Sequence, residues 1–89
     1  MLMKNNQELS RFELEISGQT VYATYKILGS VLNINYVFAP QELRGSSAAG
    51  KLMEEIVQAA KKDKLKINPV CGYAAAWLRK HKEYHDLLA

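Results

Sequence analysis

Hydrophobic and polar residues alternate along the first half of the chain, and this pattern predicts β-strands. Phe12, Leu14 and Ile16 alternate with charged and hydroxyl residues, which is the period of two expected of a strand with one buried face. Two more runs follow, with apolar positions at Val21, Ala23, Tyr25 and Ile27, and then at Leu32, Ile34, Tyr36 and Phe38. Three consecutive strands of this kind predict an antiparallel meander.

Glycines separate the predicted strands. Gly18-Gln19 predicts a two-residue hairpin turn, because glycine at the first central position accepts the positive φ of a type II′ turn. Gly29-Ser30 predicts the next turn, and Pro40 ends the meander. The first residues carry no comparable pattern, so we expect residues 1–9 to fray.

The apolar spacing changes to a helical period over residues 47–62, where Leu52, Met53 and Ile56 share one stripe. Residues 65–70 then predict a short strand, residues 73–81 a second helix, and residues 83–88 one more helical turn. A strand, a helix and a strand in succession indicate a βαβ unit with parallel strands. The expected fold is therefore α+β or α/β, a meander followed by a βαβ unit and a C-terminal helix around a mixed sheet.

Length and composition fit one globular domain over residues 1–89, with 48% hydrophobic and 24% charged residues. No run of 18 apolar residues and no signal-peptide core is present, so we expect a cytoplasmic protein that does not enter a membrane. The net charge of +3 includes basic runs at 61–66 and 79–82. Such runs are either solvated faces or anion contacts; without an aromatic and basic RNA-binding motif, nucleic acid is not the expected partner.

The single cysteine, Cys71, cannot form an internal disulfide, and no set of metal ligands is readable, so no metal is expected. Cys71 comes at the predicted start of the last helix, where the dipole favours a thiolate. It is either a reactive thiol or a small buried residue. Tyr73 and Trp77 follow at helical spacing and are expected in the core.

A bend of small residues, Arg44-Gly45-Ser46-Ser47, precedes the long helix. Such a bend exposes backbone N–H groups at the positive end of the helix dipole, an arrangement that binds phosphate. The plain alternative is that Ser46 or Ser47 is merely the N-cap of the helix, and that the alanines of the first turn only let the helix pack closely on the sheet. Ligands of α/β sheets bind beyond the carboxyl ends of parallel strands, so we expect the bend and Cys71 to lie on one rim.

Two segments carry a family resemblance. "APQELRGSSAAGKL" (39–52) and "LKINPVCGYAAAWLRKHKEYHDLL" (65–88) resemble the minimal, single-domain branch of the GNAT acetyltransferases, which has a cysteine after the last strand. The resemblance extends from about Phe12 to Leu88. It implies a GNAT-like fold, acetyl-CoA as the cofactor, and transfer of an acetyl group to a primary amine of a small molecule or a protein lysine.

The resemblance also implies roles for particular residues. The backbone of the loop and first helical turn would hold the pyrophosphate of coenzyme A, and these residues are Arg44, Gly45, Ser46, Ser47, Ala48 and Ala49. Phe38 and Ala39 would pair with the pantetheine arm, and Arg79 and Lys80 would lie near the nucleotide. Cys71, near the cofactor sulfur, would be the catalytic residue, as the acetyl carrier of a relay or as a lining group beside direct transfer.

The sequence departs from the family pattern at Ser47, which stands at a glycine position, and at Tyr36-Val37, which replaces the usual His-Thr. These departures keep a second hypothesis open, a coenzyme A-binding or protein-interaction module with weakened catalysis. Glu42 and His81 are the candidate bases. We expect a monomer or a weak homodimer, with Tyr22, Leu28 and Val37 as exposed apolar residues that could form a contact.

Overall fold

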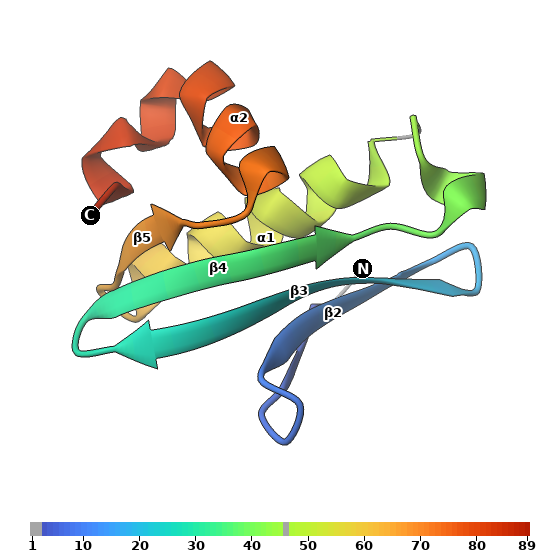
Figure 1. Cartoon of the computed structure of the whole chain (residues 1–89), viewed down its shortest axis with the longest axis horizontal. Coiled ribbons are helices and arrows are strands. Elements are labelled where there is room, and N and C mark those ends of the chain that lie inside the picture. The colour runs from blue at the N-terminus through green and yellow to red at the C-terminus, as the bar shows by residue number, and fades with distance from the viewer. Residues whose placement is uncertain (1–2, 46) are drawn as a thin grey trace.

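The structure is a computed structural model that describes residues 3–45 and 47–89. Its strands form one sheet in the order β1-β2-β3-β4-β5 (Figure 1). The strands are β1 (Lys4–Asn6), β2 (Arg11–Ile16), β3 (Gln19–Leu28), β4 (Val31–Phe38) and β5 (Lys66–Pro69). The helices are the 3₁₀ turn η1 (Gln41–Leu43), α1 (Ala48–Lys62), α2 (Gly72–Lys80) and the 3₁₀ segment η2 (Lys82–Leu87).

Strands β1 to β4 pair antiparallel, and β5 joins β4 in parallel after the crossover through α1. The predicted meander, βαβ unit, mixed sheet and C-terminal helix are confirmed. The expected fraying of residues 1–9 is wrong for Lys4–Asn6, which forms an edge strand against β2. Backbone pairing holds this segment even though its sequence, Lys-Asn-Asn, has no apolar alternation.

The first hairpin turn differs from its prediction by one residue. Ile16 pairs with Gln19, so the two loop residues are Ser17 and Gly18, with φ of 53° and 76°. Positive φ at both central positions is typical of a type I′ turn, whose twist matches that of the flanking strands. The second turn lies at Gly29-Ser30, between paired Leu28 and Val31, as predicted.

Strand β4 contains a β-bulge that the alternating pattern does not reveal. Thr24 pairs with Tyr36, whereas the next residue of β3, Tyr25, pairs with Ile34. Asn35 is therefore an extra residue on β4. One inserted residue reverses the direction of every side chain that follows it on the strand.

Because of the bulge, the predicted faces of β4 are wrong for the residues that follow Asn35. Leu32 and Ile34 are fully buried, but Tyr36 and Phe38 lie on the opposite face with Tyr22, whose ring centroid is 5.1 Å from that of Phe38. Val37, expected on the second face, instead packs partly buried against the core. The proposed contact surface of Tyr22, Leu28 and Val37 therefore does not exist as one patch.

The core lies between one face of the sheet and α1. Figure 1 shows α1 behind the sheet, and none of the described helices covers the near face, which we call the outer face. The apolar stripe of α1 is buried as predicted. Its fully buried side chains include Leu52, Met53 and Ile56, which pack in one cluster with residues such as Leu14, Val21 and Ile67.

An aromatic cluster in the C-terminal segment packs against α1. The Trp77 ring stacks on the rings of His81 and Tyr84, with centroids 3.8 Å and 5.9 Å away, and those two rings lie 6.5 Å from each other. The two helices meet at Gly50, where an added Cβ would lie 3.4 Å from Trp77 Nε1, at ordinary van der Waals contact. Tyr84 completes the attachment through its hydroxyl, which donates to Glu54 Oε2 over 2.8 Å.

The Tyr84 contact predicts a loss of stability at alkaline pH. The hydrogen bond to Glu54, followed by burial, raises the pKa of Tyr84 above its ordinary value of about 10. The folded state then holds this proton more tightly than the unfolded state, so stability is complete below pH of about 10 and falls above it. Urea unfolding between pH 8 and 11.5 should show this decline, and Tyr84→Phe should make it less steep. An equal decline in Tyr84→Phe would assign the effect to other groups.

Candidate functional site

A cleft of about 500 Å³ opens where β4 ends and α1 begins. It is lined by the end of β4, the following loop, the first turn of α1 and one side chain of α2. The lining residues are Tyr36, Val37, Phe38, Ala39, Leu43, Arg44, Gly45, Ser47, Ala48, Ala49 and Tyr73. These segments lie far apart in the sequence, so the cleft exists only in the folded chain.

One wall of the cleft is a strand edge without a neighbour. The parallel pairing of β4 with β5 ends at Ile34 and Pro69. The next two N–H groups, of Val70 and Cys71, both donate to the Ile34 carbonyl over 3.0 Å, so the chain turns away from β4 there. Beyond Ile34, none of the described strands pairs with this edge of β4. Its backbone groups are thus available to an extended ligand.

The opposite wall is the N-terminus of α1. The first bond within the helix runs from Lys51 N–H to the Ser47 carbonyl, over 3.0 Å. The N–H groups of Ala48, Ala49 and Gly50 precede it and have no acceptor among the described residues. No acidic residue lies in this first turn. The helix end therefore presents free donors and a positive dipole end to the cleft.

Ser47 occupies the N-cap position, but its conformation is unusual. Its φ of 66° and ψ of 15° are left-handed, and its side chain makes no capping hydrogen bond to a described residue. Ser47 is therefore the N-cap residue, as the plain alternative predicted, but without a capping hydrogen bond from its side chain to a described residue. Gly45, with a φ of 84°, is the second left-handed residue of this loop. Ser46 lies outside the described residues.

The Ser47 conformation predicts that Ser47→Gly stabilises the protein. A non-glycine residue in the left-handed region costs about 1–2 kcal/mol of strain. Glycine avoids this strain, but it loses more conformational entropy on folding, which offsets part of the gain. We expect a net gain of about 0.5–1 kcal/mol, measured by urea unfolding. Ala49→Gly is the control, because glycine inside the same helix should cost up to about 1 kcal/mol. A loss of stability in Ser47→Gly would contradict the assigned backbone strain.

The loop between β4 and α1 is held by short-range contacts. Leu43 N–H donates to the Pro40 carbonyl over 2.9 Å, and the Leu43 side chain is buried. Arg44 Nε donates to the Ala39 carbonyl over 3.1 Å, which folds its side chain back across the rim of the cleft. The guanidinium therefore competes with any ligand that enters here for the Ala39 carbonyl.

The remaining predicted site residues lie around α2. Cys71 is the residue before α2, partly buried against the core, and its N–H bond to Ile34 sets it at the point where β4 and β5 separate. Arg79 and Lys80 are exposed in the last turn of α2. These three residues are not among the described residues that line the cleft. Their predicted roles remain predictions.

Tyr73 lines the cleft, although its helical spacing in the sequence predicted a place in the core. It is 43% exposed, whereas Trp77, one turn later, is only 8% exposed. Burial of the hydroxyl raises the pKa of Tyr73, so the phenol is protonated at neutral pH. Helical spacing alone could not separate the two aromatics. The folded structure does, because Tyr73 lines the cleft, with its Oη 3.8 Å from a Cβ built at Gly50 in the first turn of α1, whereas Trp77 is buried.

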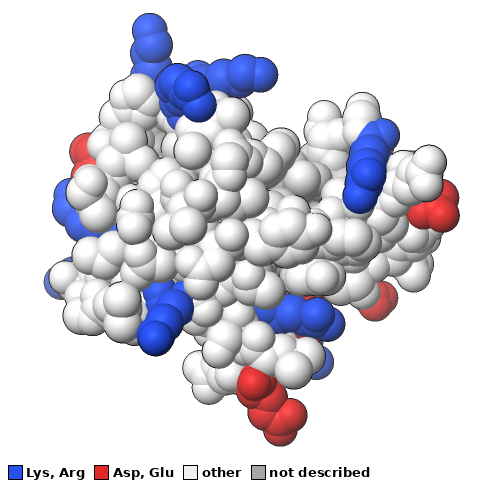
Figure 2. Space-filling model, in the orientation of Figure 1, with Lys and Arg blue, Asp and Glu red and all other residues white. Residues whose placement is uncertain are grey.

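Charge is spread unevenly around the molecule. Figure 2 shows a largely uncharged near face, with basic side chains gathered at its upper edge over the end of α2, where Arg79, Lys80 and Lys82 are found. Among residues 3–45 and 47–89, no three His, Cys, Asp or Glu side chains gather as metal ligands. No helix in the described ranges is long and apolar enough to cross a bilayer.

Comparison with known proteins decides the family. A sequence model described as GCN5-related N-acetyl-transferase matches residues 11–87, nearly the whole chain. The chain belongs to the GCN5-related N-acetyltransferase family. No curated protein matches the chain significantly.

A solved structure gives the same fold. The solution NMR structure of a GCN5-like candidate N-acetyltransferase from Staphylococcus aureus superposes with a TM-score of 0.77 at 24% sequence identity. The match covers 99% of this chain and 87% of the other. The mixed sheet and its helices are therefore a GCN5-related N-acetyltransferase fold, and the cleft lies at the end of β4, beside the first turn of α1.

Proposed function

We propose that the chain is an acetyl-CoA-dependent N-acetyltransferase that transfers an acetyl group to a primary amine. The observation that carries the proposal is the cleft, which joins a strand edge that no described strand pairs with to a helix N-terminus whose first N–H groups have no acceptor among the described residues. A strand edge suits the amides of a pantetheine arm, and a helix N-terminus suits a pyrophosphate. Few ligands carry both an amide chain for a strand edge and a pyrophosphate for a helix N-terminus.

The first turn of α1 would hold the pyrophosphate. The N–H groups of Ala48, Ala49 and Gly50 have no described acceptor, and the left-handed Gly45 and Ser47 shape the bend before them. A phosphate placed there would receive charge-assisted hydrogen bonds, which are about twice as strong as neutral ones. Ser46 is assigned to the same loop from the sequence.

The edge of β4 would hold the pantetheine arm through the backbone of Phe38 and Ala39. The Ala39 carbonyl accepts from Arg44 in the free protein, so an incoming amide would displace this side chain. The released guanidinium would lie beside the phosphates, where its planar donors fit an oxyanion. Arg44 thus contributes to both halves of the cleft.

The reacting end would lie at the bulge. Bound acetyl-CoA supplies an acetyl thioester, whose carbonyl needs a hydrogen-bond donor as negative charge develops. The N–H groups next to the extra residue Asn35, where the pairing register shifts, are the candidate donors. Cys71 lies where β4 and β5 separate and is the assigned catalytic residue, as acetyl carrier or as a lining group.

The amine must lose a proton before it attacks, a role worth roughly 10² to 10⁴ in rate where a base fills it. Glu42 is exposed in η1, outside the described lining of the cleft. The His81 ring stacks on Trp77, and its Nδ1 lies 2.7 Å from the Trp77 carbonyl. That contact engages His81 away from the cleft, so neither residue is positioned as the base, and water is the simpler proton acceptor.

Calorimetry with acetyl-CoA and coenzyme A, followed by thiol-release assays with amine acceptors, tests the proposal. We expect micromolar or weaker binding that survives Cys71→Ala, with turnover reduced by the substitution. Binding without turnover on any amine would favour the alternative, a coenzyme A-binding or interaction module. Lack of binding at millimolar ligand would reject both.

A further inference from the structure

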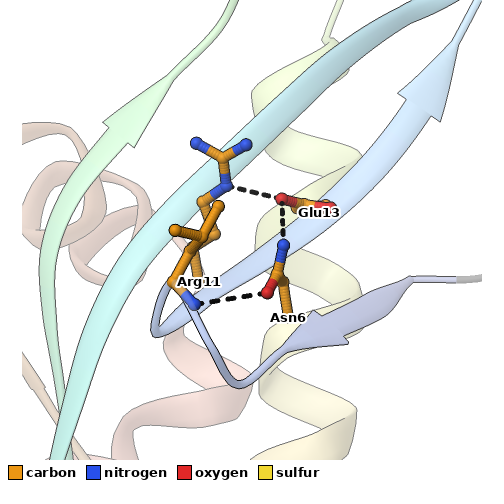
Figure 3. A network of polar contacts seen from close by, with 4 residues as sticks. Asn6, Arg11 and Glu13 are labelled. Atoms are coloured by element: carbon orange, nitrogen blue, oxygen red, sulfur yellow. Dashed lines mark hydrogen bonds and ion pairs between the residues drawn. The ribbon is translucent and has the colours of Figure 1, made fainter.

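An arginine on the outer face of the sheet is held in a fixed position near the cleft. Arg11 Nε donates to Glu13 Oε2, which also accepts from Asn6 Nδ2 over 3.2 Å (Figure 3). Asn6 Oδ1 in turn accepts from the Leu9 N–H over 3.2 Å. The guanidinium carbon lies 4.4 Å from the centroid of the Tyr22 ring. Because these contacts already order the side chain, a ligand would pay little further entropy to bind it.

The terminal donors of Arg11 are free. Its Nε is engaged by Glu13, but neither Nη group donates to a described residue, and the side chain keeps 29% of its surface exposed. The hydrogen bond from Arg11 lowers the pKa of Glu13, so that carboxylate is charged, and Lys4 lies opposite it in the register. Arg11, Lys4 and Glu13 together leave one positive charge, and the exposed Glu15 lies two residues further along β2. With Glu15 counted, these four side chains are neutral overall, so an anion would bind here through hydrogen bonds from the Arg11 Nη groups and not through net charge.

The arginine lies in a row of residues that leads to the cleft. Arg11 pairs with Thr24, and Thr24 pairs with Tyr36, so all three share the outer face. Two steps between strands span about 10 Å. Aromatic rings also connect Arg11 with the cleft. The Tyr22 ring lies beneath the Arg11 guanidinium and stacks on the Phe38 ring, with 5.1 Å between the two centroids. Tyr36 and Phe38 both line the cleft.

We propose that Arg11 binds the carboxylate of the acceptor, so that the acceptor is an amine that also carries a carboxylate. The inference rests on the proposed function and names its substrate class. A carboxylate takes two parallel hydrogen bonds from a guanidinium, a geometry that fixes direction as well as position. The remainder of the acceptor would lie over Thr24 and the exposed Tyr36 ring, with its amine at the bulge.

The distance sets the length of the acceptor. An extended chain of about six bonds spans about 7 Å, and a hydrogen bond adds about 3 Å, which together match the two strand spacings, about 10 Å, between the backbones of Arg11 and Tyr36. A diamine of the same length would instead bring a second positive charge beside Arg11 and Lys4. Aminocarboxylates are therefore preferred over diamines and polyamines.

NMR titration of the full chain with three ligands tests the proposal without acetyl-CoA: 6-aminohexanoate, 6-aminohexanamide and 1,6-diaminohexane. We expect the carboxylate to shift the Arg11 Nε–H and the Tyr22 and Tyr36 ring signals, with an affinity at least about 10-fold above that of the amide or the diamine. Arg11→Gln should remove this preference. Lys26→Gln is the matched control, since Lys26 lies on the outer face beyond Thr24, off the path to the cleft.

Thermal unfolding of each variant verifies that it is folded, and thiol-release kinetics with acetyl-CoA give the second readout. The ratio of kcat/KM for the acid to that for the amide should exceed about 10 in the wild type and fall to about one in Arg11→Gln. Equal affinity for acid and amide in the wild type would overturn the inference. If acetyl-CoA fails to bind while 6-aminohexanoate still binds at Arg11, the proposed function fails and the anion site stands.

Discussion

Ala49→Glu is expected to abolish coenzyme A binding while the protein stays folded. Ala49 lines the cleft in the first turn of α1, where its N–H has no described acceptor. A carboxylate there would repel the phosphates and occupy their space. We expect binding to weaken at least about 100-fold, because each charge-assisted hydrogen bond lost is worth about 1.5–3 kcal/mol. Calorimetry against acetyl-CoA gives the measurement.

The same substitution should not reduce stability, because an acidic side chain in the first turn of a helix gains about 0.3–1 kcal/mol from the dipole. Ala49→Gln is the matched control, similar in size but neutral. It should weaken binding less than glutamate does, and the difference reports the electrostatic part. If Ala49→Glu bound acetyl-CoA like the wild type, the phosphates would have to bind elsewhere, and the assignment of the helix N-terminus would be wrong.

Trp77→Ala is expected to have the largest effect on stability, at a cost of about 3–5 kcal/mol. The ring is 8% exposed, stacks on both His81 and Tyr84, and approaches Gly50 of α1. Its loss would leave a cavity between α1 and the C-terminal segment. Since small domains are stable by about 5–15 kcal/mol, much of the protein could unfold at 37 °C. Urea unfolding measures the change.

Two further variants serve as controls for Trp77→Ala. Trp77→Phe keeps a stacked ring and should lose clearly less than Trp77→Ala. Val70→Ala changes a side chain that is 60% exposed, so it should stay within about 0.5 kcal/mol of the wild type. A small effect of Trp77→Ala would mean that the aromatic stack does not join the C-terminal segment to the core.

The elements that were predicted correctly are those whose local pattern agrees with their final environment. Helix α1 runs from Ala48 to Lys62, within one residue of the range read from its apolar stripe. The turn at Gly29-Ser30 is fixed by a glycine with a φ of 62°. The bend of small residues before α1 was also readable, because such residues before a helix are a local signal, and its phosphate-binding role stays a prediction.

The errors arose where a neighbouring strand overrode the local pattern. The alternation at Leu32, Ile34, Tyr36 and Phe38 is regular in sequence, yet Asn35 bulges out because β3 pairs on either side of it with a shifted register. β1 forms for a related reason, since β2 offers an open edge to a segment that has no strand signal of its own.

The sequence by itself determined the order of elements, the apolar face of α1 and the small residues at the start of that helix, because each depends on spacing within a few residues. The tertiary structure alone decided where β4 and β5 separate, that Tyr73 faces the cleft, and that Arg11 lies across the sheet from Tyr36. These relations join residues distant in the chain. Strand register and helix docking set them, through packing and hydrogen bonds that no local pattern encodes.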